Sequence, residues 1–469
     1  MDNQFINDQV KPTVFDKFLE PAQPFVEEQN QNLTPHHNEK FSFKKFFRLL
    51  IYFFVSEYKS ISLLIDMLQK ALIPPELNLG EVPYSTFSDA FERFSSDLFK
   101  AIFISLLSTM SLRAIPELQT LGILYCVDGS VFPTLSCMLW AEYKKNSQAI
   151  KMHLCFELNR MIPVEIIVGS GNSSERNALL QMLKPIGTYI ADRGYASFRV
   201  FHEIVLAQAH FVIRVKSNFR KTVIKSLPVV LPEKVKILFQ EVTDQIIRYD
   251  KDPYGHSYRL VCFRIGTEIF HLLTDRIELT TIQIITLYAY RWQIELVFRF
   301  LKRTMNGIHL IKNIENGVTI QFYIMLIVAL LQLKLKQDVI LIQNEQNQKQ
   351  STDTDSNNDT KETDTIKSGP SLDEEKPISF ADSNTRSESI DNASLQDREN
   401  NYPPVSSSQS EDKDNMPSDE PISKPYQFFE MIGEKLKKYW KIGIHWLTAL
   451  RNMLHLPFDA RAIEILDSG

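Results

Sequence analysis

The chain has 469 residues, of which 44% are apolar and 23% charged, with 15 Gly, 22 Pro and 4 Cys. This composition excludes a collagen-like chain, a disulfide-stapled small domain and a chain that is disordered throughout. The 52 basic and 57 acidic residues give a net charge of −5, which taken alone argues against a nucleic-acid partner.

The average charge hides one strongly acidic segment, residues 343–425. Its 8 basic and 19 acidic residues give 8 − 19 = −11, so the remainder of the chain is net +6. The segment is rich in Ser, Thr, Asn, Asp and Glu and has few apolar side chains to offset the entropy of ordering the backbone. We therefore predict that it is disordered. The basic remainder permits nucleic-acid binding.

The N-terminal segment, residues 1–40, is polar and acidic and is predicted to be flexible, without a secretory signal. The four cysteines show no C-x-x-C spacing, which favours reduced thiols in a cytoplasmic protein. The longest apolar run, residues 322–335, is shorter than the roughly 20 residues of a membrane span, so it is interpreted as a buried helix and no membrane partner is expected.

Residues 41–118 are predicted to be helical because apolar side chains recur at i, i+3 and i+4, as in Phe43, Phe46, Phe47 and Leu50. The stretch from Ser85 to Phe94 suits a helix that enters a DNA groove as well as an ordinary bundle helix. The pattern alone favours the bundle helix.

From residue 119 the pattern changes to that of strands. Strands are expected at 123–130, 150–158 and 162–168, the last two joined as a hairpin at Asn159-Arg160, followed by a helix at 175–183 and a strand near 188–192. A helix at 198–207 and a strand at 211–216 complete a mixed α/β sheet. Two carboxylates lie on these strands, Asp128 in the first and Asp192 at the end of the fourth.

Residues 217–282 are rich in β-branched side chains and predict a β-rich insertion, with strands at 223–230, 235–239, 246–249, 258–265 and 269–273. A long helix is expected from Thr281 to about Arg303, with further helices to about 342. Residues 426–469 are again predicted to be helical.

The helix at 281–303 carries a polar stripe. At about 100° per residue, Tyr288, Arg291, Glu295 and Lys302 fall within roughly 60° of one another, beside an apolar arc that faces the core. Arg299 adds another cation near the stripe. A solvated, salt-bridged helix face is the usual explanation of such a pattern. Its border with the apolar face and the two carboxylates upstream favour a functional site instead.

These residues together resemble a known family. Val127-Asp128-Gly129-Ser130, Ala191-Asp192-Arg193-Gly194-Tyr195 and the Y-x2-R-x3-E-x6-K pattern of the helix are similar to the DDE transposases of bacterial insertion sequences, in particular the insertion-sequence-four group. Lys151-Met152-His153, Phe211-Val212-Ile213-Arg214 and Leu272-Leu273-Thr274 also resemble family positions. The resemblance covers about residues 85–335.

The resemblance implies an α/β fold: an RNase H-like catalytic core of residues 119–216 and 283–342, with the β-rich insertion at 217–282. The helical residues 41–118 are then the candidate domain that binds the DNA ends. Asp128, Asp192 and Glu295 are implied as catalytic residues and as ligands of two Mg²⁺ ions, or Mn²⁺, since three carboxylates suit hard divalent cations. The resemblance further implies that water would attack first and that the freed 3′-hydroxyl would then attack target DNA.

The resemblance also implies DNA contacts for the basic side chains. Tyr288, Arg291 and Lys302 would contact phosphates at the transposon end, with Arg299 as a further cation. Arg193 either orients Asp192 or binds phosphate. Trp292 could stack on a base, although a packed Trp is the favoured interpretation, and His153 is expected to be structural.

The family pattern usually has an acidic residue in the turn after the third strand, for which Glu175 is the candidate. The implied partners are the double-stranded terminal repeats and target DNA, with the protein acting as a homodimer. A DNA-binding protein without catalytic activity and a structure-selective nuclease of the same fold are the alternatives. The acidic segment is interpreted as a linker to a partner protomer or as a competitor of DNA for basic surface.

Overall fold

A computed structural model describes residues 11–34, 41–56, 58–110, 115–134, 137–144, 147–217, 219–236, 239–305, 309–355 and 444–468. Residues 1–349 and 423–469 form one compact unit, and residues 350–422 form a second. The elements described below belong to the first unit, apart from the end of one long helix.

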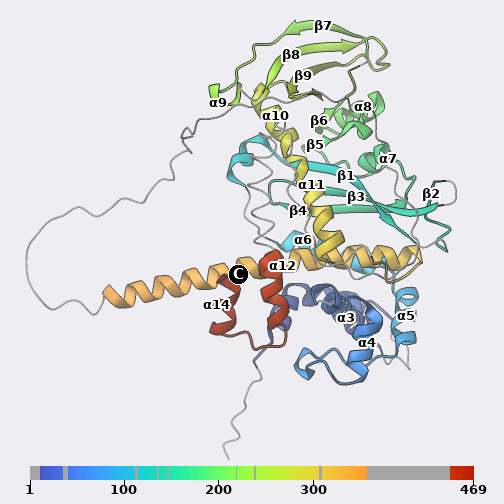
Figure 1. Cartoon of the computed structure of the whole chain (residues 1–469), viewed down its shortest axis with the longest axis vertical. Helices are drawn as coiled ribbons and strands as arrows, with labels where there is room; N and C mark the ends of the chain where they lie inside the picture. The colour runs from blue at the N-terminus through green and yellow to red at the C-terminus, as the bar shows by residue number, and fades with distance from the viewer. Residues whose placement is uncertain are drawn as a thin grey trace, which may run out of the picture. The chain divides into compact units, whose positions relative to one another are not determined.

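The N-terminal part is helical, as Figure 1 shows. Phenylalanine side chains make up much of its core. Its helices are α1 Val14–Leu19, α2 Gln23–Gln31, α3 Phe43–Val55, α4 Ile61–Gln69, α5 Tyr84–Arg93 and α6 Ser96–Thr109. The ring of Phe46 on α3 is in contact with five others, those of Phe41, Phe87, Phe91, Phe94 and Phe99. The helical periodicity predicted for residues 41–118 is therefore present in α3 to α6.

The flexible N-terminus predicted for residues 1–40 is wrong where α1 and α2 form. The hydroxyl of Thr13 accepts a hydrogen bond of 3.0 Å from the backbone N–H of Asp16, which caps α1. The backbone N–H of Val14 donates to the carbonyl of Leu456 (2.8 Å), so the segment is held by the C-terminal part of the chain. Because Val14 and Leu456 are far apart in the sequence, no local sequence pattern predicts this contact.

Ten strands form one mixed sheet in the order β2-β3-β1-β5-β6-β10-β9-β8-β7, with β4 beside β3. The first six are β1 Leu124–Pro133, β2 Glu142–Lys144, β3 Ser147–Glu157, β4 Ile162–Ser170, β5 Thr188–Ala191 and β6 His210–Arg214. Strand β3 is antiparallel to β1 and β4, whereas β5 is parallel to both β1 and β6. The mixed α/β sheet and the β3–β4 hairpin predicted from the sequence are present.

The remaining strands lie within the predicted β-rich insertion: β7 Lys221–Ser226, β8 Gln240–Tyr249, β9 Ser257–Ile265 and β10 Glu268–Thr274. Strand β10 pairs antiparallel with β6, so the insertion continues the sheet of the core. The strand expected at 235–239 is wrong, since Glu233–Lys236 forms one helical turn, α9. Residues 237 and 238 lie outside the described residues.

Helices cover both faces of the sheet. Phe201 of α8 (Phe198–Leu206) stacks on Phe211 of β6, with ring centroids 5.0 Å apart. On the other face, the Sγ atom of Cys126 on β1 lies 4.0 Å from the carbonyl oxygen of Tyr290 on α10 (Thr281–Tyr290). Helix α7 (Glu175–Gln181) connects β4 to β5.

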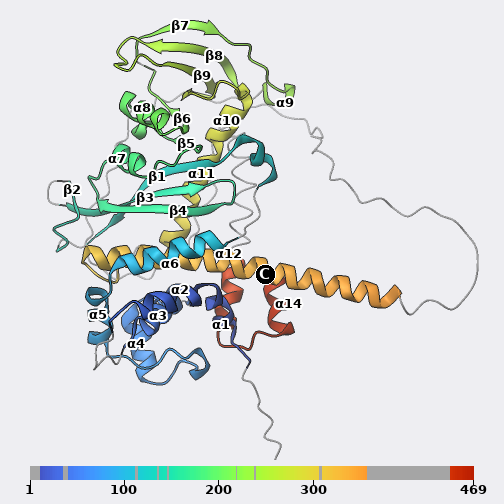
Figure 2. The same ribbon diagram turned by 180° about the vertical axis from the view of Figure 1, so that it is seen from behind.

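Helix α12, Glu315–Asp355, joins the sheet to the N-terminal helices. Phe322 of α12 packs on Phe132 of β1 and Tyr323 packs on Phe103 of α6, so α6 and α12 lie side by side, as Figure 2 shows from behind. Residues 315–348 have the length and hydropathy of a membrane span, but 78% of the most apolar window is buried within the protein. The interpretation of 322–335 as a buried helix is confirmed.

The disordered segment predicted for 343–425 is wrong over its first residues, because α12 continues to Asp355. Glu, Gln and Lys are good helix formers that extend a helix already nucleated by its buried part. Residues 356–425 lie outside the described residues, as do 426–443 of the predicted C-terminal helices. Residues 444–453 and α14 (Ala460–Ser468) are helical.

Candidate active site

Asp128 and Asp192 lie side by side because two parallel strands are in register. Cys126 of β1 is level with Ile190 of β5. Asp128 follows Cys126 by two residues within β1, and Asp192 follows Ile190 by two residues, directly after β5 ends. Adjacent strands are about 4.8 Å apart, so the two residues lie near each other at the C-terminal end of β5.

The third carboxylate is on the helices that cross this face. Helix α10 begins with a capping box between Thr280 and Gln283, and α11 (Trp292–Arg299) follows it directly. The single continuous helix predicted from Thr281 to Arg303 is therefore wrong in detail. It is interrupted at Arg291, where the amide N–H bonds to the carbonyl of Tyr288 three residues back (3.1 Å), and it ends in a π-helical turn, Phe300–Thr304.

Arg291 lies between the carboxylates. Its Nη1 atom is 3.4 Å from Oδ2 of Asp128, and its Nη2 atom donates to Oε1 of Glu295 at 2.9 Å. The Tyr288 hydroxyl donates to Oδ1 of Asp192 at 3.1 Å. The structure thus brings together all three predicted acids and two of the predicted DNA-binding side chains, and the guanidinium is the link between β1 and α11.

The two aspartates differ in electrostatics. Burial raises the pKa of Asp128 to about 6, against the opposing charge of Arg291 and the hydrogen bond from the Gly129 amide. Burial also acts to raise the pKa of Asp192. There, the backbone N–H of Arg193, the charge of Arg291 and the Tyr288 hydroxyl outweigh burial, so the pKa of Asp192 lies below its usual value. Asp192 is thus ionised at neutral pH, whereas Asp128 is much closer to its titration point.

The other predicted cations surround this cluster. Lys302 donates from Nζ to the carbonyl of Val131 on β1 at 2.8 Å, and desolvation lowers its pKa. The side chains of Arg299, at the end of α11, and of Arg193, directly after Asp192, are exposed. The packed Trp292 favoured by the sequence is wrong, because 40% of this residue is exposed at the start of α11.

A further acid–base pair lies next to the aspartates. Lys151 on β3 donates from Nζ to Oε1 of Glu175 at 2.7 Å. A Cβ atom on Gly194 would come within 2.1 Å of the other Glu175 oxygen, so the glycine permits Glu175 to approach the Asp192 loop. The sequence offers Glu175 only as a family position, and its link to Lys151 depends on the tertiary fold.

Two nearby side chains are buried. His153 is fully buried with Nε2 2.9 Å from the Ser173 hydroxyl, and burial lowers its pKa to about 4, which agrees with the structural role predicted for it. Tyr195, from the Asp192 loop, is 1% exposed, and its hydroxyl has no hydrogen-bond partner among the described residues. A buried donor without a partner costs free energy, so a bound group that accepts a hydrogen bond from this hydroxyl would be stabilised here.

The donor set suits a divalent cation in its chemistry. Carboxylate oxygens are the ligands that Mg²⁺ and Mn²⁺ prefer, and the buried Asp128 gains most from a nearby positive charge. Among the described residues, however, no three acidic, His or Cys side chains stand close enough to hold an ion as they are.

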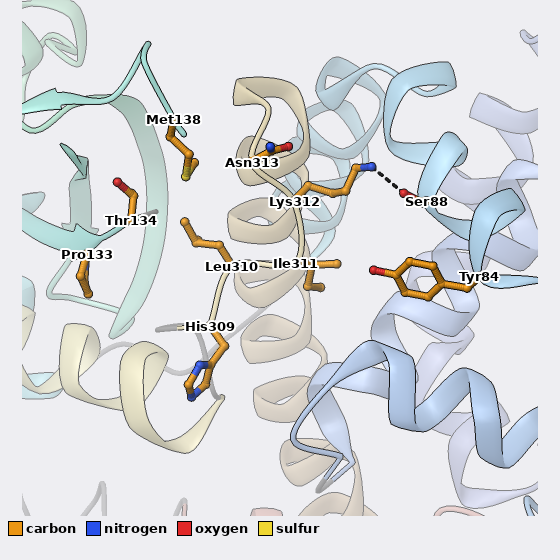
Figure 3. Close-up of a pocket in the computed structure, with 10 residues that line it drawn as sticks. All are labelled: Tyr84, Ser88, Pro133, Thr134, Met138, His309, Leu310, Ile311, Lys312 and Asn313. Atoms are coloured by element: carbon orange, nitrogen blue, oxygen red, sulfur yellow. Dashed lines mark hydrogen bonds between the residues drawn. The ribbon is translucent and has the colours of Figure 1, made fainter. Parts of the chain in front are cut away.

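A cleft of about 490 Å³ lies beyond the end of β1, between the sheet and α5 (Figure 3). It is lined by Tyr84, Ser88, Pro133, Thr134, Met138 and residues 309–313. On the α5 side of the cleft, Lys312 donates to the Ser88 hydroxyl at 2.7 Å. Pro133, which lines the cleft, is two residues after Val131, the residue whose carbonyl accepts the hydrogen bond from Lys302. The cleft is therefore next to the Lys302 side of the candidate site.

A mixed sheet with two neighbouring aspartates beneath a helix that carries a glutamate is the arrangement expected of a DDE-type catalytic domain. Residues 120–331 match a family of protein domains described as the transposase DDE domain. The predicted DDE transposase domain is confirmed for this part of the chain.

Three similar proteins are described as transposases. The chain is 28% identical over 222 residues to the protein y4zB of Sinorhizobium fredii, covering 45% of this chain and 61% of that protein, which is less than two thirds of its length. It is 23% identical to the insertion sequence element IS5377 protein of Geobacillus stearothermophilus, covering 54% of this chain and 67% of that protein. It is 26% identical to the insertion sequence element IS4SA protein of Synechocystis, covering 55% and 74%.

Among solved structures, the chain is similar to the piggyBac transposase in a synaptic complex with hairpin DNA. The TM-score is 0.40 with 11% sequence identity, over 70% of this chain and 74% of that chain.

Proposed function

We propose that the chain is a DNA transposase that cleaves DNA at the ends of an insertion sequence and joins the freed 3′ ends to target DNA. The observation that carries this proposal is the convergence of Asp128, Asp192 and Glu295 around Arg291 within a transposase DDE domain. Asp128 and Asp192 come from adjacent parallel strands and Glu295 from the helix packed on them, so the three oxygens of one site derive from a rigid scaffold.

The strand arrangement supports an RNase H-like core. Its five strands follow the order β4-β3-β1-β5-β6, with β1, β3 and β4 antiparallel and β5 and β6 parallel to β1. In this proposal the insertion β7–β10 extends the same sheet, and the helices α3 to α6 of residues 41–118 bind the DNA ends.

Each side chain has a distinct task in the proposed reaction. Asp128, Asp192 and Glu295 would hold two Mg²⁺ or Mn²⁺ ions, which when bound supply the positive charge that a phosphodiester needs to accept a nucleophile and release an oxygen. The Tyr288 hydroxyl fixes the orientation of the Asp192 carboxylate. Water breaks one P–O3′ bond at the transposon end, and the resulting 3′-hydroxyl then displaces an O3′ of the target strand.

The DNA would be held by side chains around the same cluster. Arg291 is suited to bidentate contact with phosphate, Lys302 provides a point charge, and Tyr288 a hydroxyl donor. Arg299 and Arg193 add exposed cations, and the exposed Trp292 is available for stacking on a base. The proposed partners are double-stranded terminal repeats and target DNA, bound by a homodimer that acts on the nucleoid in the cytoplasm.

A cleavage assay tests this function. The full chain is incubated with a labelled duplex of the DNA that flanks its gene, with and without Mg²⁺. We expect Mg²⁺-dependent nicking that is lost in Asp128→Asn, Asp192→Asn and Glu295→Gln while DNA binding persists. Glu165→Gln removes a carboxylate from β4 of the same sheet, where it pairs with Lys184, and should nick normally. Full cleavage by Asp128→Asn would refute the assignment, and binding without cleavage even in Mn²⁺ would favour a non-catalytic DNA-binding protein.

A further inference from the structure

Arg291 lies between the carboxylates that would hold the metal ions in the proposed reaction. One guanidinium contacts Asp128 and Glu295, and its charge also acts on Asp192, so it is the counter-ion of all three acids. Only 14% of its side chain is exposed. A surface ion pair on a helix would be mostly solvated, whereas this one is enclosed between strand β1 and helix α11.

We propose that Arg291 is a positioning residue that holds Asp128 and Glu295 together in the DNA-free protein, and that a DNA phosphate must take over its guanidinium before a divalent cation can bind there tightly. The inference rests on the proposed function and deepens it, because it makes metal binding depend on DNA. It gives Arg291 a second task beyond phosphate contact.

The two cations compete because they require the same oxygens. Mg²⁺ or Mn²⁺ would bind through the same carboxylate oxygens. The Glu295 oxygen that accepts from Nη2 at 2.9 Å and the Asp128 oxygen 3.4 Å from Nη1 face the guanidinium. A metal ion in their midst would meet a fixed positive charge within a few ångströms, at a site mostly closed to solvent that could screen it.

Phosphate is the natural group to draw the guanidinium away. The planar guanidinium fork matches two phosphate oxygens as well as it matches carboxylates. On one side of Arg291 along the chain is Tyr288, which is bonded to Asp192, and on the other is the exposed Trp292. Glu295, with 34% of its side chain exposed, lies at the solvent edge, where a DNA strand can reach the pair.

The backbone at Arg291 permits this exchange. Hydrogen bonds of i to i−3 spacing on both sides, to Tyr288 (3.1 Å) and from Ile294 (3.2 Å), mark a local tightening between α10 and α11. The π turn at 300–304 then loosens the other end of α11. Glu295 is therefore on a short helix with an irregular turn at each end, and such turns often mark hinges in helices.

Mn²⁺ binding to the full chain, measured by calorimetry without DNA, tests the inference. Arg291→Gln should tighten Mn²⁺ binding by about tenfold or more, since it removes a fixed positive charge that contacts the carboxylates of Asp128 and Glu295. The matched control is Arg303→Gln, which removes an exposed cation from the adjoining turn and should leave the affinity unchanged. Adding Asp128→Asn to Arg291→Gln should abolish the tightened binding, which assigns it to this site.

The reciprocal measurement uses the labelled flanking duplex as the probe. In the wild-type chain, Ca²⁺ should tighten binding of the duplex. Thermodynamic linkage requires that the duplex tighten Ca²⁺ binding by about the same factor. This coupling should vanish in Arg291→Gln. Equal, Asp128-dependent Mn²⁺ affinity in the wild-type chain and in Arg291→Gln would overturn the inference and leave the proposed function standing. Mn²⁺ binding that never depends on Asp128 would overturn both.

Discussion

A buried ion pair anchors the start of the helix that carries the candidate site. Asp244 of β8 is bound by Arg259 of β9 through two hydrogen bonds, Nε to Oδ1 at 2.9 Å and Nη2 to Oδ2 at 2.7 Å. Thr281, the first residue of α10, donates its hydroxyl to the same carboxylate at 2.7 Å. The side chain of Asp244 is 0% exposed and that of Arg259 is 4% exposed. The pair therefore links the β-rich insertion to the helix of Tyr288.

We predict that Asp244→Ala destabilises the folded chain by about 3–5 kcal/mol, because it leaves the guanidinium of Arg259 buried without its counter-charge. At about 2–4 °C per kcal/mol for a large domain, Tm should fall by roughly 10 °C. The matched control is Glu241→Ala. Glu241 pairs with Arg264 across the same two strands at 2.9 Å but is 65% exposed. An exposed pair of this kind contributes less than about 1 kcal/mol.

Thermal unfolding followed by circular dichroism measures both variants. The double variant Asp244→Leu, Arg259→Met should recover part of the loss, since no buried charge is left unpaired. Recovery stays incomplete because the carbonyls of Ile277 and Leu279 lose their donor. Equal Tm changes for Asp244→Ala and Glu241→Ala would refute the reasoning, as would a double variant no more stable than Asp244→Ala.

Three further predictions follow from the site and the acidic segment. Burial raises the pKa of Asp128 to about 6, whereas its pKa in the unfolded chain is near 4. Between these two pH values the folded state holds a proton that the unfolded state has released, so the stability of the fold falls as pH rises through this range. In metal-free buffer Asp128→Asn should thus raise Tm at pH 8 and lose this advantage near pH 4; a constant difference across this range would contradict it. Gly129→Ala places a Cβ 2.7 Å from Cε of Lys151, so it should lower nicking while DNA binding persists, and normal nicking would show that Lys151 can yield. Deleting residues 356–425, which carry 7 basic and 16 acidic side chains, should tighten DNA binding most at low salt if the segment competes with DNA, and anisotropy titrations with unchanged affinity would make it a tolerated insertion.

The sequence predicted the chemistry of the site better than its geometry. Asp128 and Asp192 could be found because Asp128 lies within a run of strand-forming residues and Asp192 ends another. Glu295 could be found from its helical spacing to Arg291. The stripe calculation assumed a regular helix, however, and the breaks at Arg291 and at 300–304 depend on tertiary packing.

What the sequence missed are contacts between distant segments. The pairing of β10 with β6 joins residues near 213 and 273, so nothing local showed that the insertion continues the core sheet. The N-terminal helices are held by residues near 455. The central place of Arg291 also could not be foreseen, because its i+4 spacing to Glu295 is equally typical of a surface pair.

In the proposed function, this site joins DNA strands as well as cutting them. The most direct measurement incubates the full chain with a labelled duplex of a flanking end and a supercoiled target plasmid in Mg²⁺. We predict that label becomes covalently joined to the plasmid, and that Asp128→Asn abolishes joining while the duplex is still bound. Cleavage of the duplex without any joined product would contradict the account and favour a structure-selective nuclease.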